Sequence, residues 1–421
     1  MLQKYKLGEL VEVTRGASLS GDYYSTKGEY IRLTCGNFDY RNNCFKENTS
    51  KDNLFYAGEF RSEYLLEKDD IITPLTEQAI GLLGTTARIP ESGKYIQSQD
   101  VALVKCKAGK IDPAFCYYLI SSKLVRNQLS VAAQQTKIRH TSPDKIKDCT
   151  VWIPELDEQI AIGRLLASLD EKMLLNKRIN DNLEAMAKQL YDYWFVQFDF
   201  PNEDGKPYKS SGGVMVWNEK LKREIPKGLD TPKIGDIEKN IITGKTPSCA
   251  DEDNFGGDIP FVTIDDIRGN LFVFEAQRTL STKGADSQEK KYLPIGSLSV
   301  SCIGTIGVMG FVARLAQTNQ QINSIVFEHE YNKEFLYFSL KLYFDNAKAK
   351  TGNVFANMSK EEFASIIVAY PPKQILQAFH NKVAPIFDSI KNNIEEINSL
   401  TKQRDELLPL LMNGQATVNS D

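Results

Sequence analysis

Residues that could bind phosphate occur in this sequence, but not with the spacing that this chemistry needs. Gly244-Lys245-Thr246 resembles the end of a phosphate-binding loop. Such a loop needs another glycine five positions before Gly244, where this chain has Lys239. A turn before a strand explains the segment better, so we expect no nucleotide phosphate to bind here.

Motifs for methyl transfer, metal binding and hydrolysis are also incomplete. Tyr370-Pro371-Pro372 is similar to the aromatic-proline motif of amino-methyltransferases but lacks the leading Asp or Asn. The three histidines lie far apart, and the seven cysteines form no C-x-x-C pair. The paired acids Asp265 and Asp266 suit a solvated or helix-capping role better than catalysis. The sequence therefore indicates a binding protein, with no catalytic residues and no metal site.

Composition is that of an ordinary folded protein with room for two or three domains. The chain has 421 residues, of which 42% are hydrophobic and 25% charged. Its net charge of -4 does not mark a nucleic-acid binder, although local basic patches remain possible. Scattered cysteines and the absence of an apolar signal region at the start predict a cytoplasmic protein. Residues 294–313 carry no charge but contain four glycines, which favours buried strands with glycine turns over a membrane span.

The element that must position any binding residues is a long amphipathic helix, predicted from about residue 156 to residue 198. Its apolar residues recur at steps of four and three, the heptad seam of a coiled coil. The ten seam positions are Ile162, Leu166, Leu169, Met173, Asn176, Asn180, Leu183, Ala187, Leu190 and Trp194. A helix of roughly 40 residues is on the order of 60 Å long, too long to pack within one compact domain. A single stripe of this kind is more often ordinary core than a spacer.

A second segment near the end of the chain favours a spacer over ordinary core, because it has the same ten-position spacing as the first. These are Phe379, Val383, Ile386, Ile390, Asn393, Ile397, Leu400, Arg404, Leu407 and Leu411. Two remote helices that share one register imply an internal repeat, in which each half is a domain followed by its helix. Pro385 and Pro409 should kink this second helix or make it restart.

Shorter segments repeat in the same order within each half. Arg15-Gly16-Ala17-Ser18 corresponds to Thr243-Gly244-Lys245-Thr246, and Ser98-Gln99-Asp100-Val101 corresponds to Asn319-Gln320-Gln321-Ile322. We predict an α+β fold with two similar domains whose cores are mainly β, separated by two long antiparallel coiled-coil helices in a pseudo-twofold internal repeat. The predicted boundaries are 1–155 for domain 1, 156–199 for helix 1, 200–232 for an irregular connection, 233–372 for domain 2 and 373–421 for helix 2.

The seam asparagines predict how the two helices meet, because a buried amide needs a partner. If Asn180 faces Asn393, then Leu183 faces Ile390 and Trp194 faces Phe379. In this register Asn176 meets Ile397 and Leu169 meets Arg404, which requires the polar ends to reach water. One Asn layer that sets the register at some cost in stability is a known use of this residue.

Four stretches give the chain a family resemblance: Ile153-Pro154-Glu155-Leu156-Asp157-Glu158-Gln159-Ile160, Tyr193-Trp194-Phe195-Val196-Gln197-Phe198, residues 200–213 and Leu407-Leu408-Pro409-Leu410-Leu411-Met412-Asn413-Gly414. Together they resemble the specificity (S) subunits of type I restriction-modification systems over essentially the whole chain. The second copy departs from the pattern, because it has Lys373-Gln374-Ile375 after the prolines, where acidic residues are usual.

The resemblance implies a non-catalytic subunit that binds double-stranded DNA. Each domain would recognise one half of a split, asymmetric target, and the helices would set the gap between the halves. Two modification (methyltransferase) subunits would bind around the helix pair, and restriction (translocase/nuclease) subunits would join them. S-adenosylmethionine, ATP and Mg would be bound by those partners and no cofactor by this chain. The rival interpretation is a protein-interaction scaffold that carries two binding domains on a coiled-coil spacer and never meets DNA.

Base edges are read by Arg, Lys, Asn, Gln, Ser or Thr on loops, and other basic residues contact phosphates. The candidates in the first domain are Arg15, Ser18, Gln97, Gln99, Lys137, Arg139 and His140. Those in the second domain are Lys245, Thr246, Asn319, Gln320, Gln321 and Asn323. For each of them, a solvated turn residue is an equally good interpretation.

Overall fold

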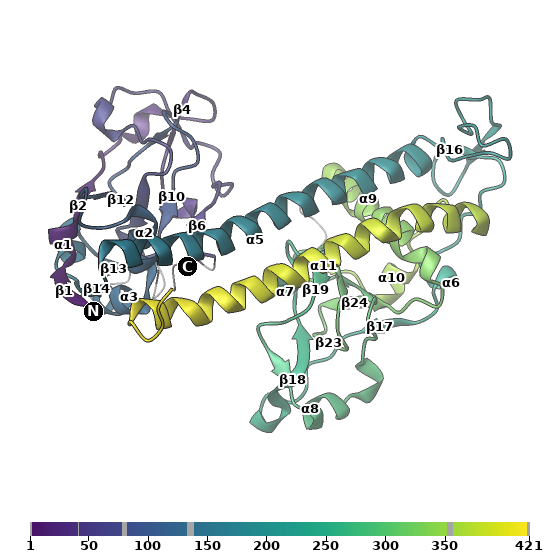
Figure 1. Ribbon diagram of the computed structural model, residues 1–421. Helices are drawn as coiled ribbons and strands as arrows, with labels where there is room; N and C mark the ends of the chain where they lie inside the picture. Colours follow the sequence, from purple (N-terminus) through teal and green to yellow (C-terminus); the bar gives the residue numbers. More distant parts are fainter. Residues whose placement is uncertain (1, 41, 78–81, 133–138, 352–356, 419–421) are drawn as a thin grey trace. The chain divides into compact units, whose positions relative to one another are not determined.

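The computed structural model describes residues 2–40, 42–77, 82–132, 139–351 and 357–418, and the chain folds as two compact units (Figure 1). Unit 1 consists of Met1–Met173 with Ser399–Asp421, and unit 2 of Leu174–Asn398. The division falls inside both long helices, so each helix contributes one end to each unit. The predicted division, in which the helices are separate spacers, stays a prediction.

Unit 1 is built on an antiparallel sheet with the strand order β10-β8-β12-β2 and a mixed sheet with the order β11-β4-β7-β3. Their strands are β2 (Val11–Arg15), β3 (Tyr24–Ser25), β4 (Tyr30–Arg32), β7 (Phe55–Tyr56), β8 (Ile71–Pro74), β10 (Ala87–Arg88), β11 (Tyr95–Ile96) and β12 (Val101–Cys106). Shorter pairs join β1 (Gln3–Lys6) to β14 (Thr150–Ile153), β5 (Phe38–Asp39) to β6 (Cys44–Phe45) and β9 (Thr76–Glu77) to β13 (Arg139–His140). The short helices are α1 (Leu7–Leu10), α2 (Pro113–Ser121), α3 (Lys123–Ala132) and α4 (Pro143–Lys147), with 3-10 turns at Gly21–Tyr23, Cys35–Asn37 and Ser62–Tyr64.

Unit 2 repeats this plan with a five-stranded sheet of order β17-β24-β21-β22-β19 and a three-stranded sheet of order β20-β18-β23. Its strands are β17 (Ile241–Thr243), β18 (Phe255–Val262), β19 (Phe272–Val273), β20 (Thr279–Leu280), β21 (Leu298–Ser301), β22 (Met309–Val312), β23 (Gln317–Thr318) and β24 (Ile322–Ile325). A hairpin of β15 (Met215–Asn218) and β16 (Arg223–Pro226) precedes them. Besides the two long helices, unit 2 has α6 (Ile234–Ile237), α7 (Ile264–Ile267), α8 (Thr282–Asp286), the 19-residue α9 (Lys333–Thr351) and α10 (Lys360–Ala364), with 3-10 turns at Glu252–Asn254, Glu289–Lys291 and Glu330–Asn332.

Burial explains why these segments become strands. In β2, Val11 and Val13 are buried and alternate with exposed residues, the period of a strand with one face on the core. The central strands β12 and β21 are buried on both faces, and β21 buries two serines along with its leucine and valine. The β cores that the sequence predicts are therefore confirmed in both units.

The uncharged segment 294–313 forms β21 and β22, as its glycines indicate. Gly296, Gly304 and Gly307 have φ values of +85°, +77° and +81°, which only glycine adopts without strain. Among the described residues, no helix combines the length and the apolar character that a membrane span requires.

The first long helix, α5, runs over Leu156–Tyr191 and continues as a π-helical turn at Asp192–Val196. The second, α11, runs without a break over Lys373–Met412. The helix therefore does not restart at Pro385 or Pro409, whereas a kink at either proline stays a prediction. A proline inside a helix costs about 3 kcal/mol, but Phe379, Val383 and Phe387 are buried on the turns around it, and each such side chain contributes roughly 1.5–3 kcal/mol.

In unit 2, α5 and α11 lie side by side and antiparallel (Figure 1), with the two register asparagines in contact. Asn393 Nδ2 donates to Asn180 Oδ1 at 2.8 Å. One turn away, Asn176 Nδ2 donates to Glu396 Oε2 at 2.7 Å, so its amide meets a carboxylate rather than water. In unit 1, Arg404 Nη1 likewise lies 3.0 Å from Asp170 Oδ1. The helix ends in unit 1 thus keep the same antiparallel order.

Candidate nucleic-acid interface

The first candidate loop of unit 1 follows β2 and lies against residues 97–99. Ala17 N donates to Gln97 O at 3.0 Å, and Arg15 Nε donates to Gln99 O at 2.8 Å. A Cβ on Gly16 would lie 2.2 Å from Gln97 O, so only glycine permits this approach. The contact leaves the side chains of Arg15, Ser18 and Gln99 exposed at one end of the sheet.

Gln97 requires a correction, because its side chain is only 1% exposed. Its Nε2 donates to Thr14 O at 2.9 Å and to Val101 O at 3.0 Å, so the amide joins the backbones of two strands. A base edge must be met by an exposed amide. The buried side chain of Gln97 therefore stabilises the turn that carries Gln99 and is not accessible to a ligand.

In the basic cluster of unit 1, Lys137, Arg139 and His140, the last two residues differ in burial. Arg139 pairs with Glu77 in the two-stranded ladder, and its Nε lies 3.4 Å from Glu77 Oε1, with side chains 17% and 0% exposed. The same carboxylate accepts hydrogen bonds from Leu82 N and Leu83 N, so Arg139 neutralises a buried charge. His140 is exposed. Lys137 lies outside the described residues.

Unit 2 brings together the corresponding two loops. Lys245 N donates to Thr318 O at 2.9 Å, and Thr246 Oγ1 donates to Gln320 Oε1 at 2.7 Å. A Cβ on Gly244 would lie 2.2 Å from a backbone oxygen, as on Gly16. Lys245 and Gln320 are exposed.

The turn that presents Gln320 is built by its neighbours. Asn319 Nδ2 donates to Gln321 Oε1 at 3.0 Å, and Gln321 N donates to Asn319 Oδ1 at 3.1 Å. Both side chains are half-buried. Asn323 requires a second correction: it is 3% exposed within β24, and its Oδ1 accepts a hydrogen bond from Thr243 Oγ1 at 2.7 Å.

Arg268 is a further exposed basic residue of unit 2 that sequence reasoning did not find. It follows α7, which Asp266 caps by accepting hydrogen bonds from Thr263 N and Oγ1 at 2.8 and 2.7 Å. Asp266 thus has the capping role expected for the acid pair. Arg268 Nη2 donates to Thr305 Oγ1 at 3.5 Å. The Thr263–Asp266 spacing of a capping box was the available signal that a short helix would present Arg268 at its end.

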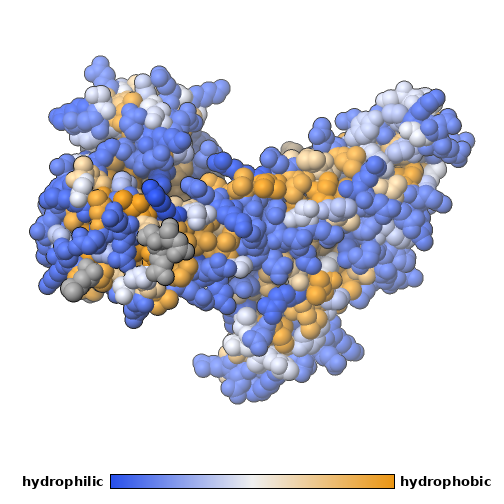
Figure 2. Space-filling view, in the orientation of Figure 1, coloured by the Kyte–Doolittle hydropathy of each residue, from blue (hydrophilic) through white to orange (hydrophobic). Residues whose placement is uncertain are grey.

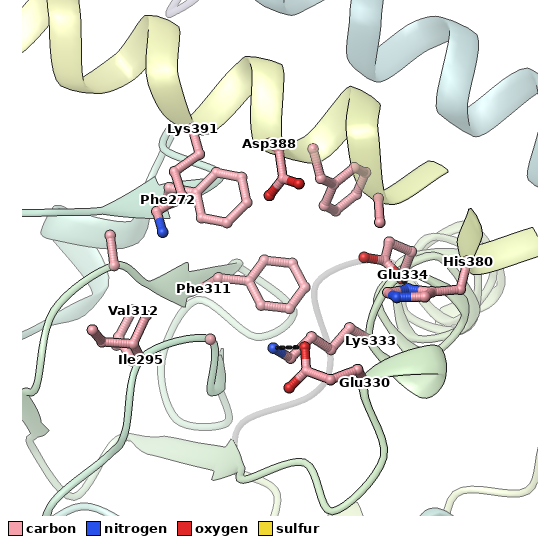
Figure 3. A pocket seen from close by; sticks show the side chains of 14 residues that line it. Phe272, Ile295, Phe311, Val312, Glu330, Lys333, Glu334, His380, Asp388 and Lys391 are labelled. Atoms are coloured by element: carbon pink, nitrogen blue, oxygen red, sulfur yellow. Dashed lines mark hydrogen bonds and ion pairs between the residues drawn. The ribbon is translucent and has the colours of Figure 1, made fainter. Parts of the chain in front are cut away.

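A separate pocket of about 240 Å³ lies in unit 2 between α11, the start of α9 and the sheet (Figure 3). Phe272 and Phe311 form its apolar part, and His380 Nδ1 lies 2.6 Å from Glu334 Oε2. That hydrogen bond raises the pKa of His380 above its ordinary value of 6.5. Within the described ranges, no group of three His, Cys, Asp or Glu side chains could hold a metal ion.

Comparison with known proteins agrees with the repeated architecture. A model of the type I restriction modification DNA specificity domain matches residues 2–185 and 226–404. The HindI type I restriction enzyme specificity subunit of Haemophilus influenzae is 29% identical over 373 residues, which are 76% of this chain and 81% of that protein. The MjaIX specificity subunit of Methanocaldococcus jannaschii is 24% identical over 324 residues, 72% of this chain and 69% of that protein.

A solved structure shares the fold. The S subunit of a type I restriction-modification system from M. genitalium superimposes with a TM-score of 0.58 at 15% identity, over 98% of this chain and 96% of that one. Since the family model covers both halves and most of the chain, this protein belongs to the specificity subunits of type I restriction-modification systems.

Proposed function

We propose that this chain reads a split, asymmetric DNA target, with one half-sequence assigned to each unit. DNA sequence recognition is the general role of the family. The observation that carries the proposal is the repeated loop pair: a glycine-containing turn packed on a polar turn at one end of each sheet. Arg15, Ser18 and Gln99 are exposed there in unit 1, and Lys245 and Gln320 in unit 2. One backbone frame with different side chains suits two different half-sequences.

The helix pair would set the gap between the half-sequences. The Asn180–Asn393 hydrogen bond supports a single register, because a slip by one heptad would separate the two amides. Half-sites read from one side of a duplex are best placed about one helical turn apart, roughly 34 Å. Fixed helix pairing would make that distance a property of this chain.

The chain itself would perform no chemistry, and two modification subunits would bind around the helices and carry S-adenosylmethionine. Restriction subunits would add the ATP- and Mg-dependent steps. The α5 helix offers a surface for such a partner: Leu175, Ile179 and Met186 follow one face at helical spacing and are 56%, 38% and 57% exposed. Figure 2 shows apolar surface over this part of α5. Exposed apolar stripes of this kind mark protein-binding sites.

Sequence-resolved methylation tests the proposal. The chain is expressed with a modification subunit from the same source, and DNA from these cells is compared with DNA from cells that lack the chain. We expect a new split motif with a methylated adenine in each half. A stable complex between the two proteins without any new mark would favour the scaffold interpretation.

A further inference from the structure

A third segment joins the two candidate loops in unit 1, at the short ladder between β9 and β13. His140 pairs with Thr76, and Thr141 N then donates to Leu75 O at 2.9 Å. The next residue, Ser142, caps α4 by accepting a hydrogen bond from Lys145 N. Three consecutive residues therefore have distinct roles: His140 is exposed, Thr141 is hydrogen-bonded to the neighbouring strand, and Ser142 caps α4.

Unit 2 contains the same arrangement, although the two sequences have little in common here. Asn357 forms a bridge with Ile303, and Met358 N donates to Cys302 O at 2.7 Å. Ser359 then caps α10 by accepting from Glu362 N at 3.1 Å. Asn357 thus occupies the position of His140, and it is exposed as His140 is.

In each unit the residue that pairs with this third segment is also hydrogen-bonded to the polar turn already described. Leu75 N donates to Asp100 O at 2.8 Å, directly after Gln99. Cys302 N donates to Gln321 O at 2.8 Å, directly after Gln320. Leu75 and Cys302 therefore lie between the polar turn and the third segment and hydrogen-bond to both. This equivalence places Asn357 near the end of the sheet where Gln320 is exposed.

We propose that Asn357 contacts a base edge in the half-sequence read by unit 2, as the counterpart of His140 in unit 1; this rests on the proposed function. The NH2 group of an Asn side chain can donate to N7 of adenine, and its carbonyl oxygen can accept from N6 in the major groove. Thr305 lies two residues beyond Ile303, the bridge partner of Asn357, and accepts a hydrogen bond from Arg268. The side chains of Thr305 and Arg268 supply further donors. Adenine is the base that Asn357 should select.

Binding measurements on the complex of this chain with its modification subunits test the inference. The probes are duplexes that carry the motif found by methylation mapping and single-base variants of it. We expect Asn357→Ala to remove a preference of roughly 5- to 150-fold for one adenine in one half of the motif. The other half should keep its base preferences. His140→Ala should change base preference only in that other half.

Two further variants test whether an effect of Asn357→Ala reflects a base contact at this position. Asn240 is an exposed asparagine at the opposite end of β17, so Asn240→Ala should leave all base preferences unchanged. Asn357→Asp keeps the side-chain shape but only accepts hydrogen bonds, so it should exchange the preference for adenine for one for cytosine. Unchanged base preferences in both Asn357 variants, or an equal loss for every duplex, would overturn the inference. A wild-type complex without any sequence preference would instead overturn the proposed function.

Discussion

At the scale of single residues, Gln97 and Gln99 are two glutamines only two positions apart, and they have different surroundings. The fold separates them because Gln97 Nε2 lies between two backbone carbonyls while Gln99 is exposed. Asn323 and Asn357 differ in the same way, and only the second is available to a ligand. Burial of an individual amide depends on tertiary contacts that no local pattern encodes.

Gln97→Ala should therefore reduce stability, whereas Gln99→Ala should reduce DNA binding. Removing the Gln97 amide leaves the carbonyls of Thr14 and Val101 without this donor, and we expect a loss of about 1–3 kcal/mol in the free energy of unfolding. Gln99→Ala should stay within about 0.5 kcal/mol of the wild type while it weakens DNA binding. Urea unfolding of the purified chain, followed by duplex binding, measures both. Equal losses of stability would show that Gln97 does not hold the loop.

At the scale of elements, the seam of each long helix was predictable because ten spaced positions repeat between remote segments. None of these twenty positions is exposed in the structure. The continuity of α11 was not predictable, since the local cost of Pro385 is outweighed by packing that the sequence does not display. Likewise, the carboxylate partners of Asn176 and Arg404 come from neighbouring helix positions rather than from the facing seam residue.

The Asn180–Asn393 layer should reduce stability relative to an apolar layer while fixing the register. Asn180→Leu alone leaves the Asn393 amide without its partner and should cost about 1 kcal/mol in the free energy of unfolding. Replacing both residues by leucine should recover that loss and exceed the wild type, as apolar layers do in coiled coils. Urea unfolding of the single and double variants gives the coupling between the two sites. A double variant less stable than either single variant would contradict the assigned register.

His380 should make the stability of unit 2 depend on pH. The hydrogen bond to Glu334 raises the pKa of His380 in the folded chain, with a further contribution from Glu330, whereas burial and Lys333 oppose the rise. The stabilisation is therefore complete below the ordinary pKa of 6.5 and is lost as the pH rises through the raised value. The difference in unfolding temperature between wild type and His380→Gln should shrink between about pH 6 and pH 8. His329→Gln is the control, because the ring of His329 stacks on Tyr331, whereas His380 is hydrogen-bonded to a carboxylate. A difference that grows over this range would have the wrong sign.

At the scale of the whole molecule, the two halves of the sequence fold on one plan, and the repeat is conserved in hydrogen bonds more than in residue types. Gly16 and Gly244 make the same close approach, and Ser142 and Ser359 cap equivalent helices. The residues around these fixed points differ, including His140 and Asn357. A shared frame with independent side chains allows each half-sequence to change without refolding the other unit, whereas the gap would depend on the helices.

Lengthening the helix pair should therefore change the gap alone. Seven residues inserted after Leu183 in α5, with seven inserted at the facing Ile390 in α11, keep the heptad pattern and the Asn180–Asn393 layer. The insertion adds about 10 Å of helix, which corresponds to roughly three base pairs of duplex at 3.4 Å each. Methylation mapping should then find both half-sequences unchanged and separated by a longer gap. An altered half-sequence would contradict the assignment of spacing to the helices, because base reading would then depend on elements that lie outside the loop pairs.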